Sequence, residues 1–169
     1  MKLNARSIAL CAVLTALALG LSTLENLFPV TLIVPLPGVK LGLANIVTVF
    51  ALYELGAVPA LTILAARCLL GGIFAGNLSA LLFSLLGGFT AMLVMIALHA
   101  LPRLSVYGVS VGGAAAHNCG QVAAAMLTLG SAAPLAYLPF LLLVSVFTGA
   151  LTGFVAALLF RAMRHARAK

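Results

Sequence analysis

Residues Glu25–Asn45 read ENLFPVTLIVPLPGVKLGLAN and interrupt an otherwise apolar sequence. The segment holds one of the two acidic residues, three of the seven prolines and the only lysine away from the chain ends, Lys40. Polar and proline-stiffened residues between two long apolar runs are typical of a connection between membrane helices. We therefore expect a loop over residues 25–40.

Composition indicates the class of protein. Of the 169 residues, 64% are hydrophobic and only 7% are charged, and the mean hydropathy is +1.29. A soluble domain carries roughly 25% charged residues, so this chain has too little polar surface for a water-soluble globule. It is expected to be an all-α, polytopic protein of the plasma membrane.

The net charge of +7 is concentrated at the two ends of the chain. Basic residues that flank apolar spans are typical of the positive-inside rule and of contact with anionic lipid headgroups. This distribution argues against nucleic acid as a partner and favours the lipid bilayer. The terminal basic residues are Lys2, Arg6, Arg161, Arg164, Arg167 and Lys169.

The apolar runs predict six helices, since one membrane crossing takes about 20 apolar residues. They form a single integral membrane domain over residues 1–169, a six-transmembrane-helix bundle. An even number of crossings places both termini on one side, which the positive-inside rule makes cytoplasmic. The loop at residues 25–40 is then on the outer side. The expected helices cover residues 5–24, 41–55, 57–75, 77–101, 107–129 and 135–163.

Arg67 lies midway along the expected helix 57–75. A charged side chain in hydrocarbon is costly, so Arg67 is expected to point inward and to be paired. Two interpretations remain open. Arg67 forms a structural ion pair with Glu25 or Glu54, or bonds to backbone carbonyls, or else it contacts a ligand directly. The charges expected near a solute are Glu25, Lys40 and Arg67, and this excess of bases favours a carboxylate- or phosphate-bearing solute.

A second polar group, His117, Asn118 and Gln121, reads HNxxQ within the expected helix 107–129. His117 and Gln121 are one turn apart and Asn118 lies about 100° round the helix, so all three are expected to share a face. That arrangement favours a surface that lines a ligand site, although amides and imidazoles also bridge membrane helices. The further candidate substrate-binding residues are Asn45, Asn77 and Ser84.

Small residues form a stripe on the first helix, at Ala5, Ala9, Ala12 and Ala16. They fall within an arc of roughly 60°, and in lipid such a stripe lets another helix approach closely. From these residues alone, packing within the bundle is favoured over docking of a partner. Two GxxxG pairs are likewise assigned to internal packing, namely Gly72/Gly76 and Gly149/Gly153.

No catalytic, metal or cofactor site is predicted. The chain has no aspartate and no G-x-x-x-x-G-K-[ST] phosphate loop, and its three cysteines show no metal-ligand spacing. A site for magnesium and a diphosphate needs clustered carboxylates, whereas Glu25 and Glu54 are expected at opposite membrane faces. The chain is therefore not expected to be an enzyme.

Four features together resemble the Gx transporter family: the alanine stripe, the outer loop, the string PGVKLGLANI at residues 37–46, and HNxxQ. Members of that family are often described as heptaprenyl diphosphate synthase component I, and they resemble the S components of energy-coupling factor (ECF) transporters. The resemblance covers nearly the whole chain. It implies a membrane subunit that binds a small vitamin-like solute on the outer side. Such a subunit docks, through Ala9, Ala12 and Ala16, to a membrane coupling subunit with two ATPase subunits that bind the ATP.

The resemblance also implies that the loop at residues 25–40, with Asn45, covers or lines the solute site. The chain has no tryptophan and few aromatic residues in that loop, which disfavours a flat, stacked heterocycle as the solute. The family description leaves an alternative: a non-catalytic membrane component associated with heptaprenyl diphosphate synthase, in isoprenoid-quinone metabolism.

Overall fold

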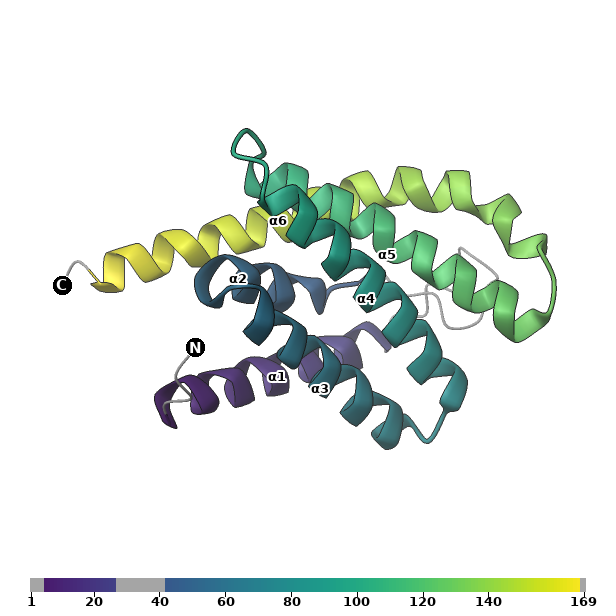
Figure 1. The fold of residues 1–169 in the computed structure, drawn as a ribbon, viewed down its shortest axis with the longest axis horizontal. Coiled ribbons are helices and arrows are strands. Elements are labelled where there is room, and N and C mark those ends of the chain that lie inside the picture. The colour runs from purple at the N-terminus through teal and green to yellow at the C-terminus, as the bar shows by residue number, and fades with distance from the viewer. Residues whose placement is uncertain (1–4, 27–41, 168–169) are drawn as a thin grey trace.

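A computed structural model describes residues 5–26 and 42–167. These residues form a bundle of six α-helices and one 3-10 helix (Figure 1), which confirms the expected all-α fold. Lys40 and most of the expected outer loop lie outside the described residues. The elements are α1 (Ala5–Asn26), α2 (Asn45–Leu55), α3 (Ala57–Ala75), α4 (Leu78–His99), α5 (Val106–Leu129), η2 (Ala133–Tyr137) and α6 (Leu138–Arg167).

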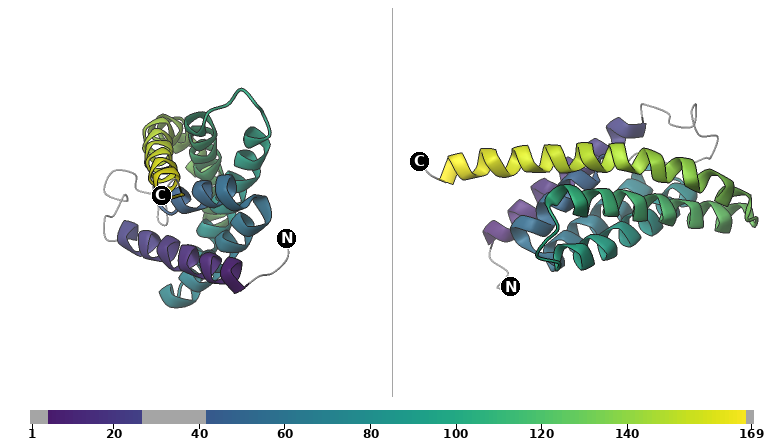
Figure 2. Two further views of the ribbon diagram at one scale, coloured as in Figure 1. Left: turned by 90° about the vertical axis from the view of Figure 1, so that its left-hand side faces the viewer. Right: turned by 90° about the horizontal axis from the view of Figure 1, so that it is seen from above.

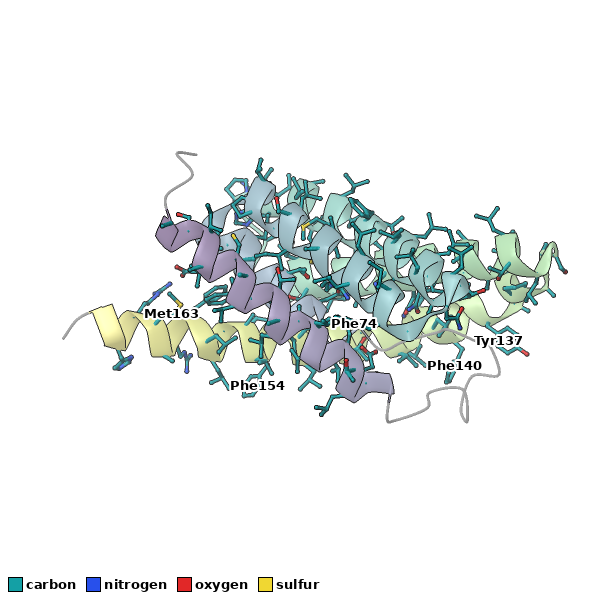
Figure 3. The ribbon with its side chains drawn as sticks, turned by 90° about the horizontal axis from the view of Figure 1, so that it is seen from below. Phe74, Tyr137, Phe140, Phe154 and Met163 are labelled. Carbon is teal, nitrogen blue, oxygen red and sulfur yellow. The ribbon has the colours of Figure 1, made fainter. Side chains whose placement is uncertain are left out.

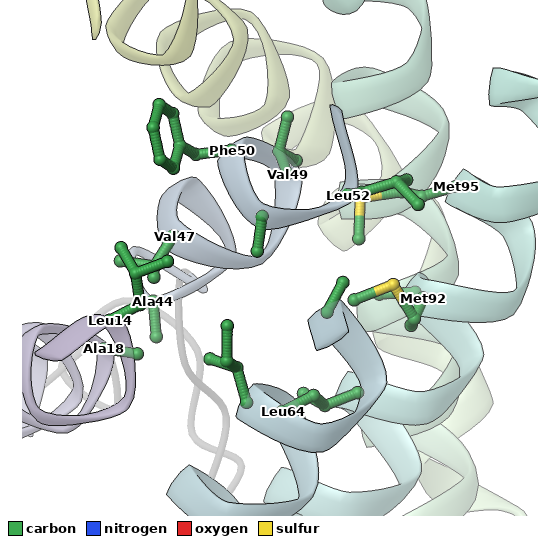
Figure 4. Close-up of a cluster of buried hydrophobic side chains, with 14 of the residues drawn as sticks. Leu14, Ala18, Ala44, Val47, Val49, Phe50, Leu52, Leu64, Met92 and Met95 are labelled. Atoms are coloured by element: carbon green, nitrogen blue, oxygen red, sulfur yellow. The ribbon is translucent and has the colours of Figure 1, made fainter. Parts of the chain in front are cut away.

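The short helix α2 lies at the centre of the bundle. Its residues 45–52 are all buried, and it packs against α1, α3, α4 and α6. Eleven residues rise only about 16 Å, roughly half the thickness of about 30 Å that a membrane helix must cross. Protein therefore surrounds α2, as Figure 4 shows. The core around it includes Leu14, Ala18, Val49, Leu52, Leu64, Met92 and Met95.

Four described segments are long and apolar enough to cross a membrane. Large apolar side chains on their surfaces, such as Val13, Ile73, Leu93 and Phe147, are exposed. So extensive an apolar surface is poorly solvated by water but is well solvated by lipid. The chain is therefore a membrane protein. The four segments are Ser7–Glu25, Ala57–Ala75, Leu78–His99 and Ala133–His165.

The expected count of six spanning helices is not confirmed. Helix α2 is too short to cross alone, at 11 residues. Helix α5 has 24 residues, but glycines and the polar side chains of HNxxQ lower its hydropathy. Both helices are instead among the most buried parts of the described bundle.

The two ends of the bundle differ in charge. Helix α1 begins and α6 ends at the same end (Figures 1 and 2), where the α2–α3 turn and the α4–α5 connection also lie. We call this the basic end, because it carries the exposed side chains of Arg103, Arg161, Arg164 and His165. The α3–α4 turn and the connection from α5 to η2 lie at the opposite end.

Glycines bring α5 and α6 into close contact. A Cβ at Gly149 would lie 2.5 Å from Val111 Cα, and one at Gly153 would lie 3.0 Å from Tyr107 Cα. This GxxxG pair packs within the bundle, as expected. The other pair divides: Gly72 packs against the Leu81 side chain, whereas Gly76 takes φ +58° and ends α3. Gly76 was therefore wrongly assigned to packing, because its role is to permit the left-handed turn.

Replacement of Gly149 by alanine is expected to destabilise the bundle. The helix propensity of alanine favours the variant by about 1 kcal/mol, but the clash with the α5 backbone costs about 1–3 kcal/mol or more. The matched control is Gly20→Ala in α1, where a Cβ has nothing within 4 Å. We expect Gly149→Ala to lower the midpoint of thermal unfolding in detergent while Gly20→Ala leaves it unchanged or raises it. Equal midpoints for both variants would contradict the close α5–α6 contact.

Candidate functional site

A pocket of about 400 Å³ opens between α1, α3 and α4, in the halves of these helices farther from the basic end. Its volume is within the range of small-molecule sites, about 300–1,000 Å³. Three of the predicted substrate-binding residues line it: Arg67, Asn77 and Ser84. The other lining residues are Leu19, Ser22, Thr23, Gly71, Phe74, Ala75 and Ala80.

Arg67 is the only charged residue in the lining of this pocket. Its side chain is 7% exposed, and its described hydrogen bonds go to two neutral groups, Ser22 Oγ at 3.3 Å and Asn45 Oδ1 at 3.4 Å. Its Nε is buried and has no hydrogen-bond partner in the described part of the chain. A guanidinium offers five N–H donors, so both long bonds together leave much of its hydrogen-bonding capacity for a ligand.

Glu25 closes the junction between α1 and α2. Its carboxylate accepts hydrogen bonds from the backbone N–H groups of Gly42 (2.5 Å) and Leu43 (3.2 Å). Gly42 takes φ +84°, and a Cβ there would lie 2.9 Å from Asn45 Nδ2. Helix α2 therefore begins at Asn45, four residues later than expected, and Asn45 is placed against Arg67. Glu25 thus supports the site indirectly, because it fixes the turn at Gly42 that positions Asn45.

The N-terminal half of α4 forms one wall of the pocket. Asn77 is the N-cap of α4, and its Oδ1 accepts hydrogen bonds from the backbone N–H groups of Ser79 (2.9 Å) and Ala80 (3.3 Å). About two turns further along, Ser84 also lines the pocket. The Cys68 thiol donates to the Ser84 carbonyl oxygen at 3.4 Å and so joins α3 to α4.

The HNxxQ residues do not converge on this pocket. His117 and Gln121 are buried beside Gly87 of α4: a Cβ at Gly87 would lie 2.9 Å from His117 Cε1 and 3.0 Å from Gln121 Cγ. Asn118 points elsewhere, since its Nδ2 donates to the Leu141 carbonyl oxygen of α6 at 2.7 Å. The three side chains therefore contact different neighbours, because α5 lies between α4 and α6. That all three line one ligand site stays a prediction.

The sequence interpretation omitted seven of the ten residues that line the pocket, among them Ser22, Gly71 and Phe74. Ser22 had a usable signal, since it is a polar side chain within a mostly apolar helix. Gly71 and Phe74 had none, because glycine and phenylalanine also occur in other apolar runs of the chain. Phe74 is 74% exposed and lies beside the C-terminal half of α1 (Figure 3).

The alanine stripe lies on the outer surface of the bundle. Ala9, Ala12 and Ala16 are all exposed, whereas Leu14 and Ala18 of the same helix are buried. These three alanines are therefore not covered by any described helix, and internal packing does not account for them.

These features define a class: an all-α membrane protein with a pocket built around one buried arginine. Among the described residues no group of three or more His, Cys, Asp or Glu side chains is placed to hold a metal ion. The family described as heptaprenyl diphosphate synthase component I matches residues 14–159. The chain belongs to this family, and the resemblance noted from the sequence is confirmed. No curated protein and no solved structure matches the chain.

Replacement of Glu25 by glutamine is expected to loosen the junction of α1 and α2. The amide keeps the shape of the side chain but turns an N–H₂ group toward a backbone N–H donor, at a cost of about 1–3 kcal/mol. Amide hydrogen exchange of Gly42 and Leu43 should accelerate. The internal control is the amide of Gly76, which bonds to the Ile73 carbonyl oxygen and should be unaffected. Unchanged exchange at Gly42 and Leu43 would contradict the role assigned to Glu25.

Proposed function

We propose that the protein is a non-catalytic membrane subunit that captures a small anionic solute for an ATP-driven importer, in the manner of an ECF S component. The observation that carries this proposal is Arg67. A buried charge inside a membrane bundle marks a functional site by default. Here the guanidinium lines an open pocket and its described partners are uncharged.

The chemistry of the pocket favours an anion. A carboxylate or phosphate on Arg67 would replace two long hydrogen bonds to neutral groups by charge-assisted bonds, which are roughly twice as strong. Ser22, Asn45 and Ser84 add polar groups near the guanidinium. The described pocket contains no carboxylate that would repel the solute.

The charge of the two ends supports an orientation in the plasma membrane. Basic residues near the ends of membrane helices are retained on the cytoplasmic side, so the basic end, with both chain termini, is assigned to the cytoplasm. The pocket opens in the opposite half of the bundle. A solute would then be captured from outside, which is the direction that import requires.

A partner must supply the energy for transport. The chain has no phosphate-binding loop, and the exposed stripe of Ala9, Ala12 and Ala16 offers a smooth surface to another membrane helix. We assign this stripe to a membrane coupling subunit that carries two ATPase subunits.

The family description favours a second candidate over the importer. Its words, heptaprenyl diphosphate synthase component I, indicate a membrane component that associates with a prenyl diphosphate synthase. The chain has no aspartate to hold the magnesium ions of such chemistry, so catalysis would belong to the partner. In this role the Arg67 pocket would bind a phosphate-bearing substrate or product of that enzyme.

The test of the solute site is native mass spectrometry of the protein purified from cells. We expect a bound small anion in the wild type, and an occupancy lower by about tenfold or more in Arg67→Gln, which corresponds to about 1.4 kcal/mol or more. Arg67→Lys should retain part of the occupancy, since lysine keeps the positive charge but lacks the paired N–H donors of a guanidinium. Arg103→Gln, the same change at the basic end, is the control. Full occupancy in Arg67→Gln would contradict the proposal.

The test of the docking surface is co-purification. Replacement of both Ala12 and Ala16 by leucine should abolish association with the partner, because bulky side chains hold the helices apart, and should leave solute binding intact. The control is Leu17→Phe, at another exposed position beside the stripe. The identity of the partner separates the two functions: a coupling subunit with ATPases supports import, and a soluble prenyl synthase supports the second candidate. Association that survives the double change would contradict the docking assignment.

A further inference from the structure

The Arg67 pocket is open on one side along the bundle. Helices α1 and α4 each pack on α3, and α3 forms the floor between them. The residues at the outer rim of the pocket are exposed on all three helices: Thr23 of α1, Phe74 of α3 and Asn77 of α4. The opening is therefore a slot between α1 and α4 rather than a closed chamber.

The surface next to this slot is apolar. Leu24 of α1 is 54% exposed and Leu78 of α4 is 80% exposed, on the two sides of the opening, and Phe74 of α3, on its floor, is 74% exposed. Side chains of this size and exposure on a membrane bundle are covered by lipid. The slot therefore faces the acyl chains on at least one side, and a ligand can reach the pocket without leaving the membrane.

Polarity changes along the floor of the slot. Arg67, Gly71 and Phe74 follow one another at helical spacing on the same face of α3. Arg67 is buried at one end of this row and Phe74 is exposed at the other, about 10 Å apart along the helix axis. Gly71 leaves the floor between them bare, because a Cβ there would meet only Leu19 Cδ1, at 3.4 Å. A charged group fits one end and a hydrocarbon chain fits the other.

We infer that the ligand of this pocket is an anionic amphiphile that enters sideways from the lipid. Its carboxylate or phosphate head binds the Arg67 guanidinium, with Ser22 and Ser84 as neighbours. Its chain crosses Gly71 and leaves past Phe74 between α1 and α4. This inference rests on the proposed role of Arg67 as an anion contact, and it adds the class of ligand and the route of entry.

The experiment uses the full chain in phosphatidylcholine nanodiscs and a dodecyl phosphate that carries a diazirine in its alkyl chain. After illumination, the labelled residues are mapped by mass spectrometry. We expect labels on the pocket-facing segments of α1 and α3, around Leu19 and Phe74. Unlabelled dodecyl phosphate should compete, whereas inorganic phosphate and dodecanol at the same concentration should not.

Three variants probe the charged end and the middle of the slot. Arg67→Gln should reduce pocket labelling about tenfold, as loss of a charged contact worth about 1.4 kcal/mol would. Gly71→Leu should reduce it similarly by filling the floor. Gly71→Ala should give a smaller reduction and leave the packing intact, because its Cβ would make only an ordinary contact with Leu19 Cδ1. The matched control is Gly20→Leu, where the added side chain enters open space on α1, and its labelling should equal that of the wild type.

The outcomes separate this inference from the proposed function. If inorganic phosphate competes as well as dodecyl phosphate, Arg67 recognises a free anion, so the proposed function stands and the amphiphile is overturned. If labelling is the same in Arg67→Gln as in the wild type, the guanidinium does not hold the head group and the inference is overturned, while the occupancy of Arg67→Gln in native mass spectrometry decides the proposed function. If labels fall evenly on lipid-facing residues such as Val13 and Phe147, the probe has only partitioned into the bilayer and the inference is overturned.

Discussion

The burial of the Arg67 guanidinium is the constraint on which the half of the bundle farther from the basic end depends. A cation surrounded by apolar helices is tolerated only when polar groups reach it. One such group comes from α1 (Ser22) and one from α2 (Asn45). Asn45 is available only because the turn at Gly42, fixed by Glu25, starts α2 at that residue. Local backbone geometry in one segment thus decides whether a charge in another can be accommodated.

The adjacent glycines of α4 border this charged region and a second group of polar side chains. A Cβ at Gly88 would meet the Leu64 and Arg67 side chains of α3, and one at Gly87 would meet His117 and Gln121 of α5. Because successive helical residues point about 100° apart, the pair lets α3 and α5 approach α4 from different sides. The second group also reaches the start of α2, since a Cβ at Gly42 would lie 2.9 Å from Asn45 Nδ2 and 3.4 Å from His117 Cδ2. The described polar residues therefore form two neighbouring groups, one that lines the pocket and one that is buried among α4, α5 and the start of α2.

Much of the helical architecture follows from hydropathy, because long apolar runs have few alternatives in a membrane. Helix α3 covers the residues expected from the sequence, and α1 ends two residues beyond its expected limit. The start of α2 could not be predicted, since it depends on hydrogen bonds between Glu25 and residues 17 and 18 positions away. Arg67 was identified because charge is rare in such a chain. Phe74 was not identified, because it lines the pocket only through the packing of α1 beside it, and nothing in the sequence around Phe74 indicates that packing.

Asn118 illustrates a limit of reasoning from helical faces. The side chains of His117, Asn118 and Gln121 do lie within a limited arc of α5, yet α5 is wedged between α4 and α6, and that arc spans both interfaces. Asn118 bonds to a carbonyl of α6, while its neighbours lie against α4. Residues on one face of a helix form one site only when a single cavity borders that face. The sequence of one helix does not tell where the neighbouring helices pack against it.

Helix α1 connects the two surfaces to which functions are assigned. Its N-terminal half carries the exposed alanines, and its C-terminal half lines the pocket through Leu19, Ser22 and Thr23. Its main contacts among the described elements are with α2 and α3, so a partner that shifts α1 also changes the pocket. By linkage, a partner that alters solute affinity has its own affinity altered by the same factor when the solute binds. An importer must use this coupling to weaken solute binding at the moment of release, whereas a component that holds a ligand near a synthase has no such requirement. The sign of that coupling is therefore a physical criterion that separates the two candidate functions.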